Sequence, residues 1–272
     1  MPTEKTGWER ENRTHFDEIV ATYDRVRPTY PDDLFADILK YAGTGKKAIE
    51  IGAGTGIATA PMLAAGYDVT AVELGENMSE FLNERFAGNN SFRVITATFE
   101  EAPVDGDDFD LVYAATAFHW VDAEIGCPKI MRLLKPDGAI ALCRCHSVPA
   151  DELYDEIQEE YEKYFYSHYT TAVRYRKKAI AEYAEPAEIK EAFRLDSLEN
   201  YGFREVIIKL YETPKTYSAD EYMDVIETYS DHAKLPESNR AALFAGIKYV
   251  INRNGGFITI DYVYQLYMGR KA

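Results

Sequence analysis

The stretch AIEIGAGTGIATA, residues 48–60, constrains the fold of this chain more than any other segment. It joins a short apolar run to three glycines at alternate positions, Gly52, Gly54 and Gly56, and then to a segment of helical composition. A glycine-rich turn between a strand and a helix lets a ligand approach the backbone closely. The pattern therefore predicts a nucleotide-binding strand–loop–helix unit within an α/β sheet.

Two acidic residues beside this loop bear on the choice of nucleotide. Dinucleotide-binding enzymes space their glycines as G-x-G-x-x-G, whereas this chain has G-x-G-x-G. Glu73 ends the next expected strand, where a carboxylate accepts hydrogen bonds from ribose hydroxyls. Glu50 lies just before the loop, where it would repel a diphosphate and stabilise a sulfonium cation. The pair favours S-adenosylmethionine over NAD; the alternative is that Glu50 is a solvated loop acid and the glycines only form a turn.

Apolar runs and helix-like segments alternate through the middle of the chain. The runs indicate strands at residues 46–52, 67–74, 92–100, 109–118 and 138–145. Helical spacing lies between them at residues 56–66, 77–87 and 122–136. We expect Asn77 to open the second helix, Pro136 to end the third, and Pro61 either to bend the first or to lie in its early turns. Strands joined by helices pair in parallel and carry helices on both faces.

The whole chain, residues 1–272, is expected to form a single domain. Residues 8–43 indicate an N-terminal helical cap, interrupted by RVRPTYP and ended by a glycine, and residues 44–146 form the cofactor-binding core. Residues 151–200 are acidic and rich in tyrosine, and they indicate one long helical insertion. Residues 201–272 hold two further strands around helices, which suggests an edge hairpin that completes the sheet.

Charge and hydropathy exclude several classes of partner. The chain has 46 acidic and 30 basic residues, a formal net charge of −16, so its surface repels a phosphate backbone and no nucleic-acid partner is expected. The basic run RYRKK, residues 174–178, falls in an expected helix among acids and is interpreted as a solvated face. No apolar run has the length that crosses a bilayer, and the N-terminus lacks an apolar signal core. We expect a cytoplasmic protein that does not bind membranes.

Three cysteines do not suggest a disulfide framework. Cys143 and Cys145 would share one face of a strand, either as small packing residues or, less simply, as thiols with a metal or redox role. Metal sites usually need further cysteine or histidine at fixed spacing, so no metal is expected.

Several stretches of the chain together resemble one known enzyme family. Four of them resemble class I S-adenosylmethionine-dependent methyltransferases of the methyltransferase type 11 group: FDEIVATYDRVRPTYP, IEIGAGTGIATAPMLAAGYDVTAVELGENM, ATFEEAPVDGDDFDLVYAATAFHWVD and RLLKPDGAIAL. The C-terminal GGFITIDYVYQLYMGRK resembles the last, antiparallel strand of that fold. The resemblance implies a Rossmann-like fold: a doubly wound, seven-stranded, mostly parallel α/β sheet with its last strand antiparallel and a helical lid inserted after strand five.

The same resemblance implies a cofactor, S-adenosyl-L-methionine, and the residues that bind it. The loop would line the methionine part, Glu73 the ribose, and the residues after strands two and three the adenine. Many relatives carry aspartate where this chain has Thr98, which leaves a hydroxyl or the backbone as acceptor for the adenine amine. The implied cofactor-binding residues are Tyr23, Arg27, Glu50, Gly52, Ala53, Gly54, Gly56, Glu73, Leu74, Met78, Thr98, Phe99, Glu100, Ala115 and Thr116.

In relatives, the N-terminal YDRVRPTYP segment folds over the cofactor. Tyr23, Arg27 and Tyr30 would then cover the methionine tail, with Arg27 as partner for its carboxylate. The alternative is that Arg27 pairs with one of the many surface acids.

Methyl transfer needs alignment and exclusion of water, and it needs a base only if the acceptor must lose a proton. His119, in AFHWVD after strand four, is the candidate catalytic base; the alternative is a structural histidine bonded to backbone or to Asp122. Trp120 either forms a pocket wall or packs in the core. Tyr30 and Tyr229 are further candidates for the acceptor site. Most of the 21 tyrosines follow residue 150, where aromatic rings would shape a lid over a small-molecule methyl acceptor.

Two other functions remain open. The fold also serves proteins that bind S-adenosylmethionine or S-adenosylhomocysteine without catalysis. An NAD(P)-dependent reductase is the other, because Tyr211 and Lys215 match Tyr-x-x-x-Lys, although Pro214 interrupts the helix that this pairing requires.

Overall fold

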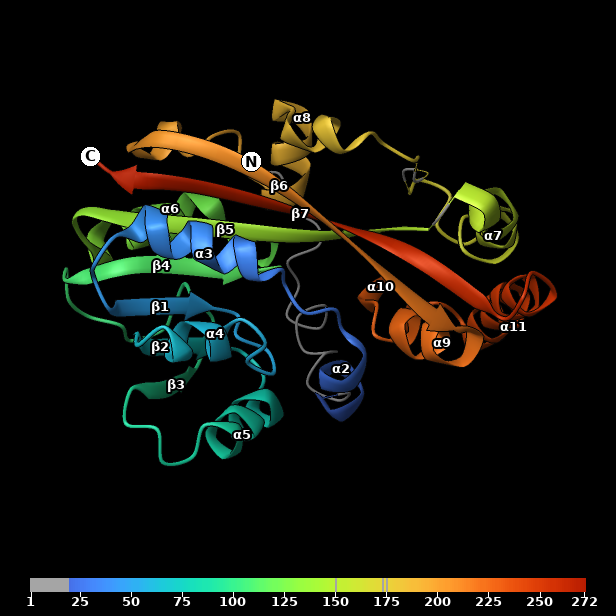
Figure 1. Ribbon diagram of the computed structural model, residues 1–272, viewed down its shortest axis with the longest axis horizontal. Coiled ribbons are helices and arrows are strands. Elements are labelled where there is room, and N and C mark those ends of the chain that lie inside the picture. The colour runs from blue at the N-terminus through green and yellow to red at the C-terminus, as the bar shows by residue number, and fades with distance from the viewer. Residues whose placement is uncertain (1–19, 150, 173, 175) are drawn as a thin grey trace, which may run out of the picture.

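A computed structural model describes residues 20–149, 151–172, 174 and 176–272 of the chain (Figure 1). The strands of these residues form one seven-stranded sheet in the order β3-β2-β1-β4-β5-β7-β6. Neighbours among the first five are parallel, and β7 is antiparallel to both β5 and β6. This confirms the predicted sheet. The strands are β1 Lys47–Ile51, β2 Asp68–Glu73, β3 Phe92–Thr96, β4 Phe109–Ala115, β5 Leu134–Pro149, β6 Phe203–Ser218 and β7 Phe257–Lys271.

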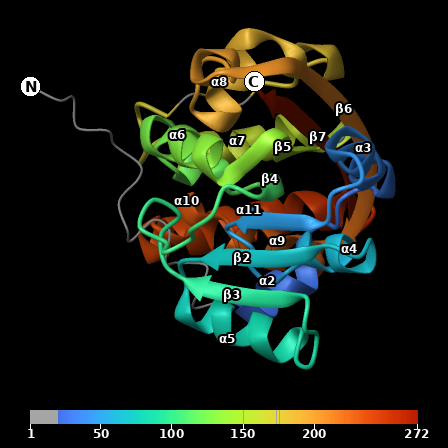
Figure 2. The same cartoon turned by 90° about the vertical axis from the view of Figure 1, so that its left-hand side faces the viewer.

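Helices cover both faces of the sheet because alternate residues of each central strand enter different cores. Ala48 of β1 packs with side chains of α3 (Asp32–Ala42) and α4 (Thr59–Ala64). Ile49, its neighbour in β1, packs with α6 (Ala123–Leu133) and α8 (Pro186–Phe193) on the opposite face. Beside β2 and β3 lies α5 (Glu76–Arg85), and Figure 2 shows β3, β2 and β1 side by side in that order. The doubly wound arrangement follows from this period-two alternation.

The last three strands are much longer than the others. β5, β6 and β7 have 15 or 16 residues, against 5 to 7 in β1 to β4. Their ends run past the parallel sheet toward a second group of helices, labelled at the right of Figure 1: α7 (Asp151–Tyr164), α9 (Ala219–Glu227), α10 (Ser230–Ala233) and α11 (Glu237–Arg253). We call this three-stranded extension the arm.

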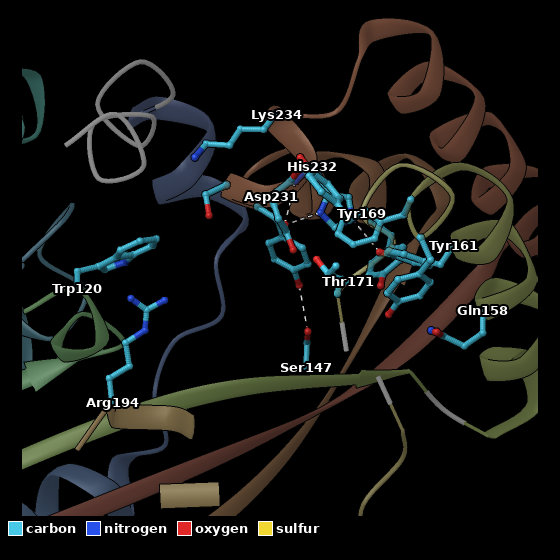
Figure 3. Close-up of a pocket in the computed structure, with 16 residues that line it drawn as sticks. Trp120, Ser147, Gln158, Tyr161, Tyr169, Thr171, Arg194, Asp231, His232 and Lys234 are labelled. Atoms are coloured by element: carbon cyan, nitrogen blue, oxygen red, sulfur yellow. Dashed lines mark hydrogen bonds and ion pairs between the residues drawn. The ribbon is translucent and has the colours of Figure 1, made fainter. Parts of the chain in front are cut away.

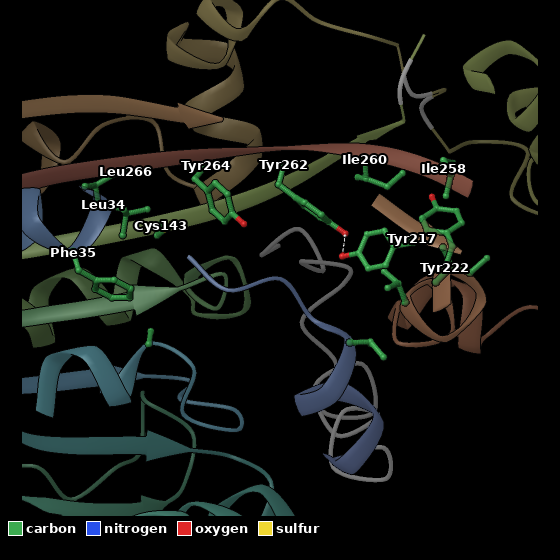
Figure 4. Close-up of a cluster of buried hydrophobic side chains, with 14 of the residues drawn as sticks. Leu34, Phe35, Cys143, Tyr217, Tyr222, Ile258, Ile260, Tyr262, Tyr264 and Leu266 are labelled. Atoms are coloured by element: carbon green, nitrogen blue, oxygen red, sulfur yellow. Dashed lines mark hydrogen bonds between the residues drawn. The ribbon is translucent and has the colours of Figure 1, made fainter. Parts of the chain in front are cut away.

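One continuous apolar cluster joins the sheet to the arm (Figure 4). It runs from Leu34 and Phe35 of α3 along β7 to Tyr262 and Ile260. Within it, the hydroxyls of Tyr217 and Tyr262 lie 2.9 Å apart and satisfy one another. Burial of these apolar side chains stabilises the packing of the second group of helices on the long strands.

Several boundaries differ from the sequence prediction. Gly75, not Asn77, caps α5, which begins at Glu76. Pro136 does not end α6, because that helix stops at Leu133 and β5 begins at Leu134, with a bulge opposite β4. The short α2 (Val20–Val26) precedes α3, which ends at Gly43 as predicted; the rest of the expected helix, residues 8–19, lies outside the described residues. Pro61 is the third residue of α4, where its missing N–H costs no helical hydrogen bond.

The prediction of one long helix over residues 151–200 was wrong. The helix α7 ends at Tyr164, and short 3-10 turns (Ile180–Ala184 and Glu199–Tyr201) flank α8. The basic run between α7 and the first of these turns is not a helical face. Its side chains form ion pairs with acids from three different elements, since Arg174 meets Glu162, Arg176 meets Glu182 and Lys178 meets Glu188.

The structure also shows the state of the paired cysteines and the hydropathy of the helices. Cys143 is buried in the apolar cluster and Cys145 is half-buried, both as free thiols. Across the part of the chain that the structure describes, no helix combines the length and apolarity that crossing a bilayer requires.

Glu50 is a carboxylate buried inside the core, 1% exposed. Its Oε2 accepts hydrogen bonds from the hydroxyls of Thr59 (2.5 Å) and Tyr113 (2.8 Å). Burial disfavours the charged form and raises the pKa of Glu50 to about 7, although both hydroxyl donors oppose the shift. Glu50 is therefore a core residue, and neither the predicted ligand-facing position nor the solvated alternative is observed.

The raised pKa of Glu50 predicts a pH-dependent contribution to stability. Between its ordinary pKa of 4.5 and about 7, the folded state keeps a proton that the unfolded state releases, so the free energy of unfolding falls as the pH rises through this window. Relative to Glu50→Gln, which does not titrate, the wild type should lose about 3 kcal/mol across this range. Urea unfolding of both proteins from pH 4.5 to 8 measures the difference. A difference that stays constant with pH would contradict the assignment.

The glycine loop predicts a second effect on stability. Gly52 has φ +67°, and a Cβ there would lie 2.6 Å from the Cβ of Ala117, which no rotamer can move away. Gly66 has φ +81°, and no atom of the described residues lies within 4 Å of where its Cβ would be, so it is a matched control for backbone strain alone. We expect Gly66→Ala to lower the free energy of unfolding by about 1–2 kcal/mol, and Gly52→Ala by roughly 1–3 kcal/mol more. Equal losses in chemical denaturation would show that the loop is not tightly packed against Ala117.

Candidate functional site

A cavity of about 120 Å³ lies at the carboxyl ends of β1 to β4. Loops that follow parallel strands meet at this edge, which is where open α/β sheets bind ligands. Ten of the fifteen predicted cofactor residues line it: Tyr23, Gly52, Gly54, Glu73, Leu74, Met78, Thr98, Phe99, Ala115 and Thr116.

Glu73 holds two loops of this cavity together. Its Oε2 accepts a hydrogen bond from the amide of Gly54 at 2.8 Å, and its Oε1 accepts one from the amide of Gly75 at 3.0 Å. The first amide belongs to the glycine loop and the second to the turn that opens α5. The side chain is only 9% exposed, so the carboxylate is fixed at the cavity wall.

Five predicted cofactor residues are not among those that line the cavity. Glu50 lies in the core beneath the loop, as described above. Ala53 packs with Leu82 of α5, Gly56 faces the same helix, and the Oε1 of Glu100 accepts a hydrogen bond from the amide of Asp122. Arg27 does not line this cavity and lies over the ring of Tyr23, which does. The sequence also missed lining residues that adjoin the predicted ones at the strand ends: Ile51, Val72, Gly75, Ala97, Ala117 and Val121.

Thr116 has an unusual backbone at the end of β4. Its φ is +58°, which is rare for a β-branched residue and marks a strained position that the surroundings hold in place. Its amide donates to the carbonyl of Cys143 at 2.7 Å, and its hydroxyl lies 2.9 Å from the hydroxyl of Tyr30. Tyr30 thus reaches the cavity at the strand ends through Thr116 and is not among its lining residues.

A second cavity, of about 610 Å³, lies between the arm and the helices α7, α9 and α10 (Figure 3). Trp120 lines both cavities, so the two share a wall. The predicted acceptor residues Trp120 and Tyr229 therefore both line this space, whereas Tyr30 and His119 do not. The remaining lining residues are Ser147, Gln158, Tyr161, Phe165, Tyr166, Tyr169, Thr171, Ala172, Arg194, Tyr222, Ser230, Asp231, His232 and Lys234.

Arg27 lies between aromatic residues of the two cavities. Its guanidinium carbon is 4.8 Å from the ring centre of Tyr23 and 5.0 Å from that of Tyr229. Its Nη2 donates to the carbonyl of Thr228 at 2.8 Å, while its buried Nε has no hydrogen-bond partner within the described ranges. Among the described residues, no carboxylate lies within 4 Å of it, so the surface ion pair that the sequence left open is not observed.

His119 is half-buried beside Trp120 and is not among the residues that line either cavity. Its ring centre is 4.8 Å from that of Trp120, and a ring nitrogen accepts a hydrogen bond from Nη1 of Arg144 at 2.8 Å. Burial lowers the pKa of His119 well below 6.5, and the charges of Arg144 and Arg194 lower it further. The observed partner of the ring is Arg144, whereas the structural alternative named the backbone or Asp122, and the role of His119 as a general base stays a prediction.

A chain of polar side chains in the second cavity was not foreseen from the sequence. Nδ1 of His232 lies 2.7 Å from a carboxylate oxygen of Asp231, and its Nε2 lies 2.9 Å from the hydroxyl of Tyr161. The rings of Tyr229 and Phe165 pack against the imidazole. This series of hydrogen bonds therefore fixes the hydroxyl of Tyr161 on the cavity wall. Its members come from α7 and α10, which are distant in sequence.

Comparisons with known proteins agree with this geometry. Residues 49–142 match the family model of a methyltransferase domain. An uncharacterized methyltransferase of Mycobacterium bovis is 33% identical over 133 residues, which cover 49% of this chain and 53% of that protein. The chain thus spans about half the length of the curated relatives that it matches first.

Solved structures share the fold at low identity. A putative type II methyltransferase from Anaeromyxobacter dehalogenans superposes with a TM-score of 0.63 at 18% identity, over 90% of this chain and 97% of that one. Phosphoethanolamine N-methyltransferase 2 of Haemonchus contortus, in complex with phosphomonomethylethanolamine and S-adenosylhomocysteine, gives 0.52 at 16% identity, over 94% of this chain and 57% of that one.

The matched domain, the strand order with its reversed β7, and a cavity at the ends of β1 to β4 agree with one another. Residues 49–142 thus resemble a methyltransferase domain, and the chain shares its fold with solved methyltransferase structures.

Proposed function

We propose that this chain is an enzyme that transfers a methyl group from S-adenosylmethionine to a small-molecule acceptor by in-line displacement. The observation that carries the proposal is the wall shared by two cavities: Trp120 lines both the cavity at the strand ends and the larger one under the arm. Displacement at a methyl group requires the acceptor to approach opposite the sulfur. Two adjoining cavities offer this arrangement, with one for the donor and one for the acceptor.

The residues at the strand ends fit S-adenosylmethionine. The Glu73 carboxylate ends β2, where it can accept from ribose hydroxyls, and Leu74 and Met78 offer apolar surface to an adenine. In the described part of the chain, Arg27 has a buried Nε without a hydrogen-bond partner, and its guanidinium suits the methionine carboxylate. Thr98 lines the cavity where many relatives carry aspartate. When bound, the cofactor supplies a methyl group made electrophilic by the sulfonium.

The chain's own contribution is alignment and the exclusion of water. A cavity of about 610 Å³ is in the range that holds small ligands, and its walls are rich in aromatic rings. The acceptor class that fits best is therefore a small molecule.

We further propose that His119 acts by positioning. Its ring nitrogen accepts from Arg144 and its face packs on Trp120, so it orders both side chains beside the two cavities. The proton of the acceptor, if it has one to lose, would then leave by another route.

The reductase alternative gains no support from the geometry. Tyr211 and Lys215 lie on the strand β6, and the hydroxyl of Tyr211 donates to Asp37 at 2.6 Å. The amine of Lys215 lies 4.8 Å from the ring centre of Tyr217. A Tyr–Lys pair of the reductase kind needs both side chains on one helix facing one cofactor.

Incubation with methyl-labelled S-adenosylmethionine and a metabolite extract tests the proposal. An enzyme yields a labelled small-molecule product together with S-adenosylhomocysteine. Saturable binding of the cofactor without a labelled product would support the non-catalytic alternative instead. A rise in melting temperature with NADH and none with S-adenosylmethionine would overturn the assignment of the cavity.

Removal of the Glu73 carboxylate should weaken cofactor binding. We expect Glu73→Ala to cost about 1–3 kcal/mol, the usual value of a hydrogen bond to a charged group, or roughly a 5- to 150-fold rise in Kd. Isothermal titration with S-adenosylmethionine measures the change. Glu76→Ala, three residues along on an exposed position of α5, is the control and should bind as the wild type does. If Glu73→Ala remains folded and binds with unchanged affinity, Glu73 is not in the site.

A further inference from the structure

The side chains near the shared wall carry an excess of positive charge. Arg194 lines the acceptor cavity, with its guanidinium carbon 5.8 Å from the ring centre of Trp120 (Figure 3). Arg144 contacts His119, whose ring centre lies 4.8 Å from that of Trp120. With Arg27 over Tyr229, three guanidinium groups surround this end of the cavity.

Two of these arginines lack acidic partners in the described part of the chain. No carboxylate lies within 4 Å of Arg27 or Arg144 there, and the Nε of each is buried without a hydrogen bond. Burial lowers the pKa of Arg144, and the neighbouring charges of Arg27 and Arg194 lower it further. Both guanidinium groups are half-buried and have only neutral hydrogen-bond partners, Thr228 and His119, and a charge withdrawn from water without an opposite charge is costly to maintain. In a chain of net charge −16, this concentration of positive charge indicates a bound anion.

The lining of the larger cavity supplies little negative charge to balance these arginines. Asp231 is the single acidic residue among the described residues that line it, and its carboxylate is bonded to Nδ1 of His232. Lys234 adds another positive charge to the lining.

The backbone conformation of Arg194 also suggests a role for its side chain. It adopts the left-handed conformation, with φ +54° and ψ +36°, at the C-terminus of α8. Glycine is the usual residue there, because a side chain costs about 1–2 kcal/mol in this conformation. A strained arginine at the rim of a cavity is the kind of outlier that suggests a role for the side chain.

The aromatic walls do not favour a cationic acceptor. An ammonium ion is usually held over the faces of aromatic rings. Here guanidinium groups already lie near three of the lining rings, those of Trp120, Tyr229 and Tyr166, the last with Arg174 at 4.8 Å. A second cation would meet repulsion from these groups and from the sulfonium of the donor.

We propose that the methyl acceptor carries an oxyanion, a carboxylate or a phosphate, which Arg194 binds beside Trp120 while Arg144 adds its charge from behind. This inference rests on the proposed function, since it assigns the class of acceptor for the same site. Arg27 is left for the carboxylate of the cofactor. The planar guanidinium of Arg194 can donate two parallel hydrogen bonds to either oxyanion.

Calorimetric titration of the protein saturated with S-adenosylhomocysteine tests this assignment. The probes are four molecules of similar size: phenylacetate, phenyl phosphate, phenylacetamide and phenethylamine. At least one of the two anions should bind roughly tenfold or more tightly than the amide, and the amine should bind more weakly still. Which anion binds more tightly distinguishes a carboxylate from a phosphate acceptor.

Three variants assign the effect to the charge of Arg194. Arg194→Gln should lower the affinity for the preferred anion roughly tenfold and leave that for the amide unchanged. Arg194→Lys keeps the charge and has the same unbranched Cβ at a strained position, so it should retain most of the affinity. Arg253→Gln, which removes a surface partner of Glu156, should have no effect.

The outcomes separate the two proposals. Failure to bind S-adenosylhomocysteine would refute the proposed function. Normal binding of S-adenosylhomocysteine, with no anion bound or with the amide or amine preferred, would refute the oxyanion assignment alone. Equal loss of anion and amide in Arg194→Gln would also refute it, because that result indicates a general disturbance of the cavity.

Discussion

The carboxylate of Glu73 accepts hydrogen bonds from two backbone amides, one in the glycine loop and one in the turn before α5. A glycine loop has little conformational preference of its own, so its shape depends on such contacts. By joining the end of β2 to the loop after β1, this one side chain determines the geometry of the cavity that the donor would occupy. The same carboxylate is placed where a ribose would lie, so structure and binding depend on the same atoms.

The second determinant is the length of β5, β6 and β7. Because these strands extend past the parallel sheet, they support α7, α9 and α10 at a distance from the strand ends. The larger cavity lies between the arm and these helices, and Trp120 lines both this cavity and the smaller one. Under the proposed function, the class of acceptor depends on side chains near the arm, whereas the donor site depends on the sheet. Such a division would let one fold serve many acceptors.

The sequence predicted the donor side well because its signals are local. Glycine spacing, strand-end acids and the apolar alternation of β1 and β2 are set by neighbours along the chain, and Gly52, Gly54 and Glu73 line the cavity at the strand ends. Their contacts with a cofactor stay predictions. Glu50 does not line this cavity, since the direction of a side chain at a strand end depends on the partner strand that supplies Tyr113. The acceptor side was predicted only in composition. Arg194 and the His232 chain come together through contacts between distant segments, which periodicity does not reveal.

A crystal structure of the protein grown with S-adenosylhomocysteine tests the central claim most directly. We expect the ribose hydroxyls on the Glu73 carboxylate, the carboxylate of the ligand toward Arg27, and the thioether directed at the wall formed by Trp120. S-adenosylhomocysteine bound elsewhere, or a dinucleotide bound across the amides of the glycine loop in its place, would contradict it.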